Sequence, residues 1–391
     1  MLKMQNQVQF YDWGSHTAMT EMYGYPNPDK QPMAELWMGA HPKASSVVTD
    51  TRGNTCSLYD FIAGDPQSAL GDEINRRFHR LPFLFKVLSA AQPLSVQVHP
   101  DKAAAEEGFA RENNAGIPLD SPVRNYKDDN HKPELVYALT PFRAMNAFRP
   151  LADIAGLLSE VAPAHPAIER FIASPSEEHL SVLFTRLLSM SGDTKERAVA
   201  VLKSALNSRQ GEPWDTIRKM TEFYPDDNGL FTPLLLNVVE LKPGEAMFLY
   251  ARTPHAYLEG TALEVMANSD NVLRAGLTQK HIDVGELLNN LDFVPKHAKS
   301  LFMQPEHINN TEIFPIPVAD FSFSVMKLHN QEMILENNSA NILFCVEGHA
   351  VITTETEQLR VISGESVFLS AIERKFKIDG EGIIARVYNA V

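Results

Sequence analysis

Polar and apolar side chains alternate over residues 93–100, PLSVQVHP. Because successive side chains of a strand point to opposite faces, Ser95, Gln97 and His99 would share one face. Gln97 and His99 then present an amide oxygen and an imidazole nitrogen in the same direction, and Zn²⁺ accepts both kinds of donor. The segment therefore predicts half of a metal site, although a strand with one solvated face would show the same alternation.

A second polar group lies at residues 126–134, YKDDNHKPE. Glu134 opens an apolar strand, where an unpaired carboxylate would be costly and a bound metal ion would compensate its charge. His131 and Lys132 add an imidazole and an ammonium, both able to transfer protons. Lys86 stands in an apolar run and needs an anion for the same reason. The alternatives are a polar turn before a strand and a lysine at a strand edge.

Charged residues are most concentrated over residues 255–280, HAYLEGTALEVMANSDNVLRAGLTQK. They alternate with apolar positions, which suits the lining of a closed polar pocket better than a solvated surface. Structural ion pairing is the alternative. The residues that could act there are His255, Glu264, Asp270, Arg274 and Lys280.

Four donors from three predicted strands complete the metal-site hypothesis. Gln97, His99, Glu134 and His255 together supply two nitrogens and two oxygens. A coordination position left open beyond such ligands is typical of catalytic rather than structural zinc.

The elements that position these residues follow from the apolar periodicity. Short strands punctuated by Pro and Gly are predicted before residue 151, among them 81–90, 93–100 and 131–139. Residues 151–225 have helical periodicity. The chain is again typical of β structure to residue 391.

Two signals predict where helices begin in the helical stretch. Ser174, Pro175 and Glu177 form an N-terminal cap with proline at the first helical position. Asp193 with Glu196 repeats the pattern.

A weak internal repeat relates LKPGEAMFLY at 241–250 to VISGESVFLS at 361–370. Each copy predicts a strand, a tight turn at the glycine and a second strand. We therefore expect two jelly-roll barrels, one before and one after about residue 310. Because His255 follows only the first copy, we expect the chemistry in the first barrel.

Composition limits the classes of function. The chain has 391 residues, with 35 Lys and Arg against 49 Asp and Glu, a net charge of −14. Such an acidic chain is not expected to bind nucleic acid or a membrane surface. Two distant cysteines, no apolar signal-peptide core and no long apolar run predict a cytoplasmic protein.

The two charged segments resemble the signatures of a known family. YKDDNHKPE fits the pattern Y-x-D-x-N-H-K-P-E, and residues 255–280 fit a second, longer signature. Gln279 stands where the family has proline. The sequence thus resembles the type I phosphomannose isomerases, over essentially its whole length.

This resemblance implies a mainly β fold of the cupin superfamily, with two cupin-type barrels and a helical insertion. The catalytic barrel would comprise residues 1–150 and 226–310, the insertion 151–225, and a C-terminal barrel without metal ligands 311–391. The implied protein is a monomer that acts on a small sugar phosphate.

The implied activity is a zinc-dependent aldose–ketose isomerisation. Mannose 6-phosphate and fructose 6-phosphate would interconvert through a cis-enediolate with proton transfer between C1 and C2. One Zn²⁺ per chain would be held by Gln97, His99, Glu134 and His255. Arg274 would be catalytic, the transferring base would be one of Lys132, His131, Glu264 and Asp270, and phosphate contacts would come from Lys86, Ser95 and Lys280.

Two other classes of function are compatible with parts of the pattern. A non-haem iron oxygenase would use two histidines and one carboxylate, but Gln97 and the cationic residues favour a phosphorylated substrate. A non-catalytic sugar-binding barrel would not need a Lewis acid beside a candidate base.

Overall fold

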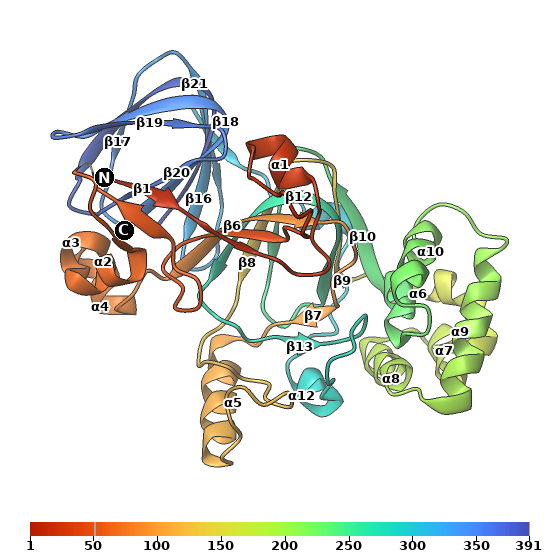
Figure 1. The fold of residues 1–391 in the computed structure, drawn as a ribbon. Helices are drawn as coiled ribbons and strands as arrows, with labels where there is room; N and C mark the ends of the chain where they lie inside the picture. The colour runs from red at the N-terminus through yellow and green to blue at the C-terminus, as the bar shows by residue number, and fades with distance from the viewer. Residues whose placement is uncertain (51, 391) are drawn as a thin grey trace.

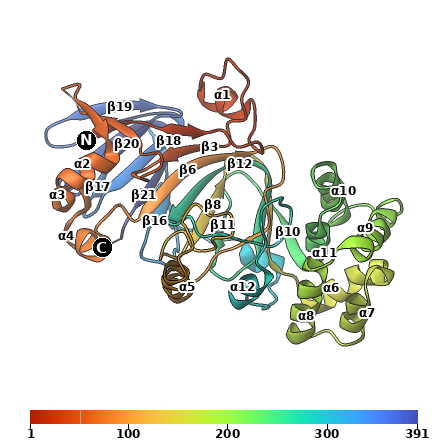
Figure 2. The same ribbon diagram turned by 60° about the horizontal axis from the view of Figure 1, so that its bottom comes forward.

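Two large antiparallel β-sheets lie side by side, with a bundle of helices at the end of the molecule away from the C-terminal strands (Figure 1). The computed structural model describes residues 1–50 and 52–390. Figure 2 shows the same separation from a second direction. This architecture confirms the expected fold class, mainly β with a helical insertion.

The first sheet carries the candidate metal ligands and is built mostly from the middle of the chain. Its strands are β2 (Gln7–Gln9), β3 (Glu35–Met38), β6 (Phe83–Ala90), β7 (Gln97–Val98), β8 (Glu134–Ala138), β9 (Phe142–Phe148), β10 (Leu236–Leu241), β11 (Ala246–Leu249), β12 (His255–Ala267) and β13 (Leu273–Arg274).

The second sheet contains the C-terminal strands together with three strands from the start of the chain. Its strands are β1 (Leu2–Gln5), β4 (Val47–Thr49), β5 (Thr55–Ser57), β14 (Glu306–Ile308), β15 (Thr311–Phe314), β16 (Ser322–His329), β17 (Met333–Glu336), β18 (Asn341–Thr353), β19 (Gln358–Ile362), β20 (Ser366–Leu369) and β21 (Lys375–Tyr388).

The early strands of the second sheet differ from the expected grouping. Leu2 pairs with Phe368, and Met4 pairs with both Ser366 and Val48, so β1 lies between β20 and β4. The first residues of the chain thus serve both sheets. The division into three domains stays a prediction.

The strands predicted around the site are present, with one shortened. β6 and β8 fall within 81–90 and 131–139. In the segment 93–100 only Gln97–Val98 forms a regular ladder, although Val96 also exchanges backbone hydrogen bonds with the 275–276 segment. Pro93 lacks an N–H group, which limits regular pairing at the start of this segment.

The helices fall into the bundle and a set that flanks the sheets. The α-helices are α1 (Ala18–Tyr23), α2 (Leu58–Gly64), α3 (Pro66–Leu70), α4 (Asp72–Phe78), α5 (Lys102–Asn114), α6 (Leu151–Leu158), α7 (Pro166–Ala173), α8 (Glu177–Leu188), α9 (Gly192–Leu206), α10 (Trp214–Phe223), α11 (Thr232–Leu235) and α12 (Val284–Asn289). Short 3₁₀ helices cover Ser159–Ala164, Asn228–Phe231 and Ala298–Leu301.

Both predicted helix starts are displaced by two residues. The cap of α8 is Ser176, which has extended backbone and accepts a hydrogen bond from the amide of His179, whereas Ser174 ends α7. α9 begins after Ser191, and Asp193 lies in its first turn, where its negative charge interacts favourably with the positive end of the helix dipole. The nearby serines offered competing caps, and packing of the apolar face selected among them.

The internal repeat corresponds to two equivalent turns. In both turns the backbone amide of the glutamate donates to the carbonyl oxygen of the residue three positions before it, and the glutamate carboxylate accepts from the backbone amide of that same residue. The pairs are Lys242 with Glu245 and Ile362 with Glu365. The predicted strand–turn–strand order is correct, but the flanking strands do not pair with each other. β10 pairs with β9 while β11 pairs with β8, so the first turn is a barrel corner.

Aromatic side chains join the two sheets in one core. The Phe85 ring of the first sheet lies 6.4 Å from that of Phe323 and 6.1 Å from that of Phe344, both in the second sheet. Tyr23 packs edge-on against Phe344 at 5.3 Å. The sheet that carries the site is therefore supported by its neighbour.

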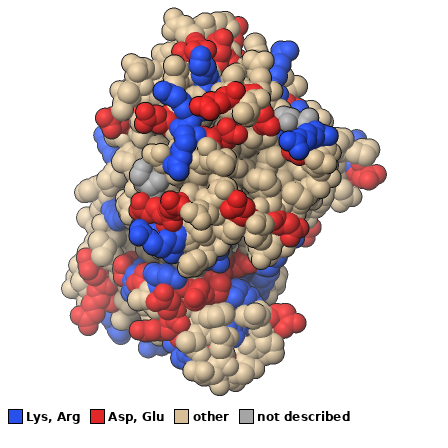
Figure 3. Space-filling model, turned by 90° about the vertical axis from the view of Figure 1, so that its left-hand side faces the viewer, with Lys and Arg blue, Asp and Glu red and all other residues tan. Residues whose placement is uncertain are grey.

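Charges on the surface are mixed. On the face formed by the C-terminal strands, acidic and basic side chains are interspersed (Figure 3). In the described part of the chain, no helix is both long and apolar enough to cross a membrane.

The shared aromatic core leads to a stability prediction. Phe344→Ala should lower the free energy of unfolding by about 3–5 kcal/mol, because it leaves a cavity between the sheets. Urea denaturation followed by circular dichroism measures this. Ile334→Ala, at a side chain that is 56% exposed, is the matched control and should change stability by less than about 0.5 kcal/mol. A loss of less than 1 kcal/mol for Phe344→Ala would contradict a core common to both sheets.

Candidate metal centre

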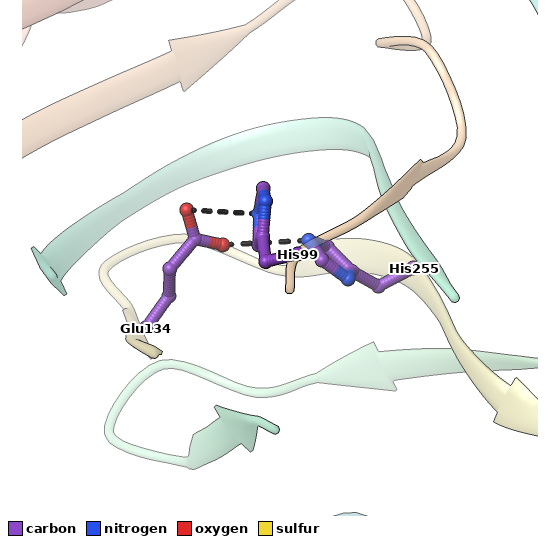
Figure 4. Close-up of side chains that lie close together, drawn as sticks. All are labelled: His99, Glu134 and His255. Carbon is purple, nitrogen blue, oxygen red and sulfur yellow. Dashed lines mark ion pairs between the residues drawn. The ribbon is translucent and has the colours of Figure 1, made fainter. Parts of the chain in front are cut away.

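Three buried side chains converge inside the first sheet (Figure 4). His99 follows β7, Glu134 begins β8 and His255 begins β12, and their ligand atoms lie within 4.8 Å of one another. The Nε2 atoms of His99 and His255 are each 3.4 Å from a different oxygen of Glu134. These are three of the four predicted metal ligands.

A bend in β12 brings both ends of that strand to the site. His255 at one end pairs with Gln97, while Met266 near the other pairs with Glu134. The bend includes Gly260, whose φ is +116° and where a Cβ atom would lie 2.5 Å from a backbone oxygen. Only glycine fits this position without strain.

Backbone carbonyl groups fix both imidazole rings. Nδ1 of His99 is 2.8 Å from the carbonyl oxygen of Asn271, and Nδ1 of His255 is 3.0 Å from that of Thr253. A carbonyl only accepts hydrogen bonds, so each Nδ1 carries a proton, which leaves Nε2 as the nitrogen of each ring that can bind a metal ion.

The donor set suits a divalent cation. Among the described atoms, the buried Nε2 of His99 has no hydrogen-bond partner. Burial lowers the pKa of the His99 imidazole to about 4, so the ring is neutral at pH 7. Burial alone would raise the pKa of Glu134, but the positive charge of Lys132 opposes burial and the pKa lies well below its usual value. A neutral His99 imidazole and an ionised Glu134 carboxylate are in the protonation states that Zn²⁺ requires of its ligands.

The fourth predicted ligand and the predicted arginine lie in the same row. Gln97 pairs with His255 on one side and with Arg274 on the other, so the three side chains share one face of the sheet. The amide nitrogen of Gln97 is 3.3 Å from the hydroxyl of Ser95. The register and this contact therefore bring together four of the predicted site residues, Ser95, Gln97, His255 and Arg274.

Arg274 and Lys280 are cations without an acidic partner. In the described chain, no carboxylate lies within ion-pair distance of either side chain. Burial lowers the pKa of the Arg274 guanidinium, and the nearby positive charge of Arg274 lowers the pKa of Lys280. Lys127, which the sequence did not single out, also contributes to this positive region. Such a group of cations favours binding of an anion.

Lys86 and Glu264 form a buried pair that is tied to further residues. The ammonium of Lys86 lies 2.9 Å from Glu264 and 3.4 Å from Glu35, and Tyr257 donates to Glu264 at 2.8 Å. Burial raises the pKa of Glu264 despite Lys86. Burial alone would lower the pKa of Lys86, but the two carboxylates raise it. Sequence reasoning missed Glu35 and Tyr257, although Glu35 is a carboxylate in an apolar strand, the signal used for Glu134.

Each of the remaining candidate bases has a charged partner, which is nearby in sequence for Lys132 and distant for His131 and Asp270. Lys132 lies 3.3 Å from Glu134, next to the proposed ligands. His131 lies 3.0 Å from Asp320 of the C-terminal region. Asp270 accepts a hydrogen bond from Lys43 at 2.5 Å, which outweighs burial and lowers its pKa. No local pattern in the sequence marks Asp320 or Lys43 as a partner.

Hydrogen bonds join the two signature segments into one unit. The side-chain oxygen of Asn271 accepts from the amides of Lys127 and Asp128, and its amide nitrogen donates to the carbonyl of Asn130. Ser269 also donates to the carboxylate of Asp128. The carbonyl of the same Asn271 fixes His99, so this junction positions a ligand.

Models of three parts of one enzyme family match the chain. They describe the phosphomannose isomerase type I catalytic domain over residues 1–151, the phosphomannose isomerase type I helical insertion domain over 157–236, and the mannose-6-phosphate isomerase cupin domain over 310–389.

Individual relatives match over the full length. The mannose-6-phosphate isomerase of Escherichia coli (strain K12) is 59% identical over 389 residues, which cover 100% of each chain. A holo, zinc-bound crystal structure of mannose 6-phosphate isomerase is 60% identical, with a TM-score of 0.97 over 100% of this chain and 99% of that one. An H99A mutant of phosphomannose isomerase from Salmonella typhimurium is 59% identical, with a TM-score of 0.98 over 100% of both chains.

The buried imidazole predicts how stability depends on pH in the zinc-free protein. The pKa of His99 is about 4 in the folded protein and 6.5 ordinarily, so the unfolded chain binds the proton more strongly. The free energy of unfolding should therefore fall as the pH drops from 6.5 towards 4, by up to about 1.4 kcal/mol per pH unit.

Urea denaturation of chelator-treated protein at several pH values measures this effect. Between pH 6.5 and 5, the dependence should be weaker in His99→Gln, because the glutamine does not titrate. His329→Gln, at an exposed histidine, should keep the parent's dependence. If the free energy of unfolding changed with pH equally in His99→Gln and in the parent, the pH dependence could not be assigned to His99.

Proposed function

The chain belongs to the type I phosphomannose isomerase family, and on this premise we propose that it interconverts mannose 6-phosphate and fructose 6-phosphate with one Zn²⁺. The observation that carries the proposal is the buried set of His99, Glu134 and His255, with both Nε2 atoms directed at the carboxylate. The ligands would be these three residues and Gln97, which pairs with His255 in the sheet.

The ion supplies Lewis-acid chemistry when bound, since a divalent cation stabilises negative charge that develops on a substrate oxygen. The reaction moves a proton between C2 and C1 through a cis-enediolate, whose charge is spread over two oxygens. Arg274 lies in the row of His255 and Gln97 and, within residues 1–50 and 52–390, has no competing carboxylate partner. We assign it the role of a fixed positive charge that stabilises the enediolate.

The proton would be moved by one of Lys132, His131, Glu264 and Asp270. Lys132 has the strongest support, because its ammonium lies 3.3 Å from the Glu134 oxygen that His99 also faces. Both oxygens of Glu264 already contact Lys86 or Tyr257, which favours a positioning role for that residue.

The phosphate would be bound at the positive region near Arg274. Lys280 is exposed and lies close enough to Arg274 for repulsion to lower its pKa, which supports a phosphate contact. Ser95 is half-buried beside Gln97 and offers a hydroxyl group. Lys86 remains a prediction as a phosphate contact, since its ammonium already pairs with Glu35 and Glu264.

The wider organisation is proposed on the same basis. Residues 1–150 and 226–310 would form the catalytic domain, 151–225 the helical insertion and 311–391 a second barrel. The protein would act in the cytoplasm as a monomer.

Zinc dependence tests the function directly. Chelator-treated protein should convert mannose 6-phosphate to fructose 6-phosphate at less than about 1% of the original rate, and added Zn²⁺ should restore conversion. Glu134→Ala should bind zinc far more weakly, because the carboxylate ligand is lost; metal analysis after gel filtration measures this. Glu222→Ala, in the helical bundle, is the control. Full conversion by zinc-free protein would refute the proposal.

Arg274→Ala tests the enediolate assignment. The substitution should lower kcat by roughly 10²–10³-fold, because it removes a charge aimed at the developing oxyanion. Steady-state kinetics with mannose 6-phosphate separate this from substrate binding, since an unchanged kcat with a raised KM would make Arg274 a binding residue instead. Arg197→Ala, on the exposed side of α9, should leave both constants unchanged.

A further inference from the structure

The loop that carries Lys280 is held by a residue from the end of the helical bundle. Asp227 caps the 3₁₀ helix Asn228–Phe231, and its Oδ1 accepts from the amide of Gly229 at 2.6 Å. The same carboxylate reaches the distant loop. Oδ1 accepts from the amide of Leu277 at 2.8 Å and Oδ2 from that of Thr278 at 3.2 Å.

The contact continues from Asp227 to Lys280 through one hydroxyl group. Oγ1 of Thr278 accepts a hydrogen bond from the amide of Lys280 at 3.1 Å. The carboxylate thus fixes Thr278, and Thr278 fixes the backbone of Lys280. Because Asp227 bonds to backbone amides, it leaves the positive charges of the loop available to a ligand.

The local backbone is closely fitted at this point. Gly276 has a φ of +121°, and a Cβ there would lie 2.7 Å from the Cα of Gly229. Leu277 has a φ of +55°, a conformation that L-residues seldom adopt unless neighbouring contacts impose it. The bonds from Asp227 to the Leu277 and Thr278 amides provide such contacts.

Beyond this point the loop is next attached at Asp283, which caps α12 and accepts a hydrogen bond from the side chain of Asn125 at 3.0 Å. A cleft of about 320 Å³ separates it from the helices and is lined by Thr278 and Gln279 on the loop side and by Lys195, Tyr224 and Asn228 on the helix side. Gln279 and Lys280 are both exposed. The position of Lys280 therefore depends on the attachments on either side of it, at Thr278 and at Asp283.

We propose that Asp227 is a positioning residue that sets the place of Lys280 for binding the substrate phosphate. This inference rests on the proposed function, because it requires Lys280 to contact phosphate. It gives the 3₁₀ helix Asn228–Phe231, which Asp227 caps, a part in substrate binding through the hydrogen bond from the Thr278 amide to Asp227.

Kinetics with mannose 6-phosphate test the proposal. Asp227→Ala should raise KM by about 5–10-fold and leave kcat within about 2-fold, since a displaced phosphate contact weakens ground and transition states alike. Thr278→Val removes only the hydroxyl link, so it should raise KM by about 2–3-fold. If Asp227→Ala does not fold, the effect of Thr278→Val on KM tests the positioning role by itself.

The Lys280→Ala background shows whether Asp227 acts through Lys280. Adding Asp227→Ala there should raise KM by less than 2-fold further, whereas a merely structural role would give the same change in both backgrounds. Asp226→Asn is the matched control, because its carboxylate is 79% exposed and pairs with Lys203. It should leave KM unchanged.

The possible results separate the two proposals. If Lys280→Ala itself leaves KM unchanged, the phosphate contact in the proposed function is wrong. If Lys280→Ala raises KM but neither Asp227→Ala nor Thr278→Val does, the contact stands and the positioning role of Asp227 is wrong. An equal rise in KM from Asp227→Ala in both backgrounds also overturns the positioning role.

Discussion

The buried carboxylate of Glu134 is the constraint on which the site depends. A charge removed from water must be compensated, and here two imidazole nitrogens and one ammonium surround it. Because backbone carbonyls orient the imidazoles of His99 and His255 so that both Nε2 atoms face the carboxylate, Lys132 and a cation between the donors are the groups that compensate its charge. The two signature segments, residues 126–134 and 255–280, hold these donors in place. Asn271 of the second segment bonds to the first segment through its side chain and to His99 through its backbone carbonyl.

Charge is distributed unevenly around this centre. On the buried side, Lys86 is paired with Glu35 and Glu264, so its charge is neutralised within the protein. On the exposed side, Arg274 and Lys280 face no carboxylate among the described residues. Lys86 is thus a buried cation whose charge is balanced by carboxylates, whereas Arg274 and Lys280 are cations that no carboxylate balances in the described part of the chain. This distribution of charge suits a substrate that reacts at one end and carries a dianionic group at the other. The paired cation supports the site, and the unpaired cations are available to the ligand.

Local patterns were sufficient to find the donors but not their surroundings. His99 and Glu134 could be selected because a polar residue in an apolar strand is visible within a few positions. The cap of α8 was placed at Ser174 instead of Ser176, because several serines could cap and the packing of the whole helix decides among them. Asp320 and Asp227 could not be found, since their contacts join segments that only the tertiary structure brings together. The types of the residues were thus enough to predict a metal site. The residues that hold its ligands in place could be identified only from strand register and long-range contacts.

The position of β1 has a consequence for synthesis on the ribosome. This strand is translated early, but its partner β20, at Ser366–Leu369, emerges only after nearly all of the chain. Until then the strand edge formed by β4 and β1 lacks a neighbour on one side. A contact over such a separation closes slowly, and an unpaired strand edge is prone to association with other chains. The edge of β1 is therefore covered only when the last strands of the chain have been synthesised, and until then it is open to association with other chains.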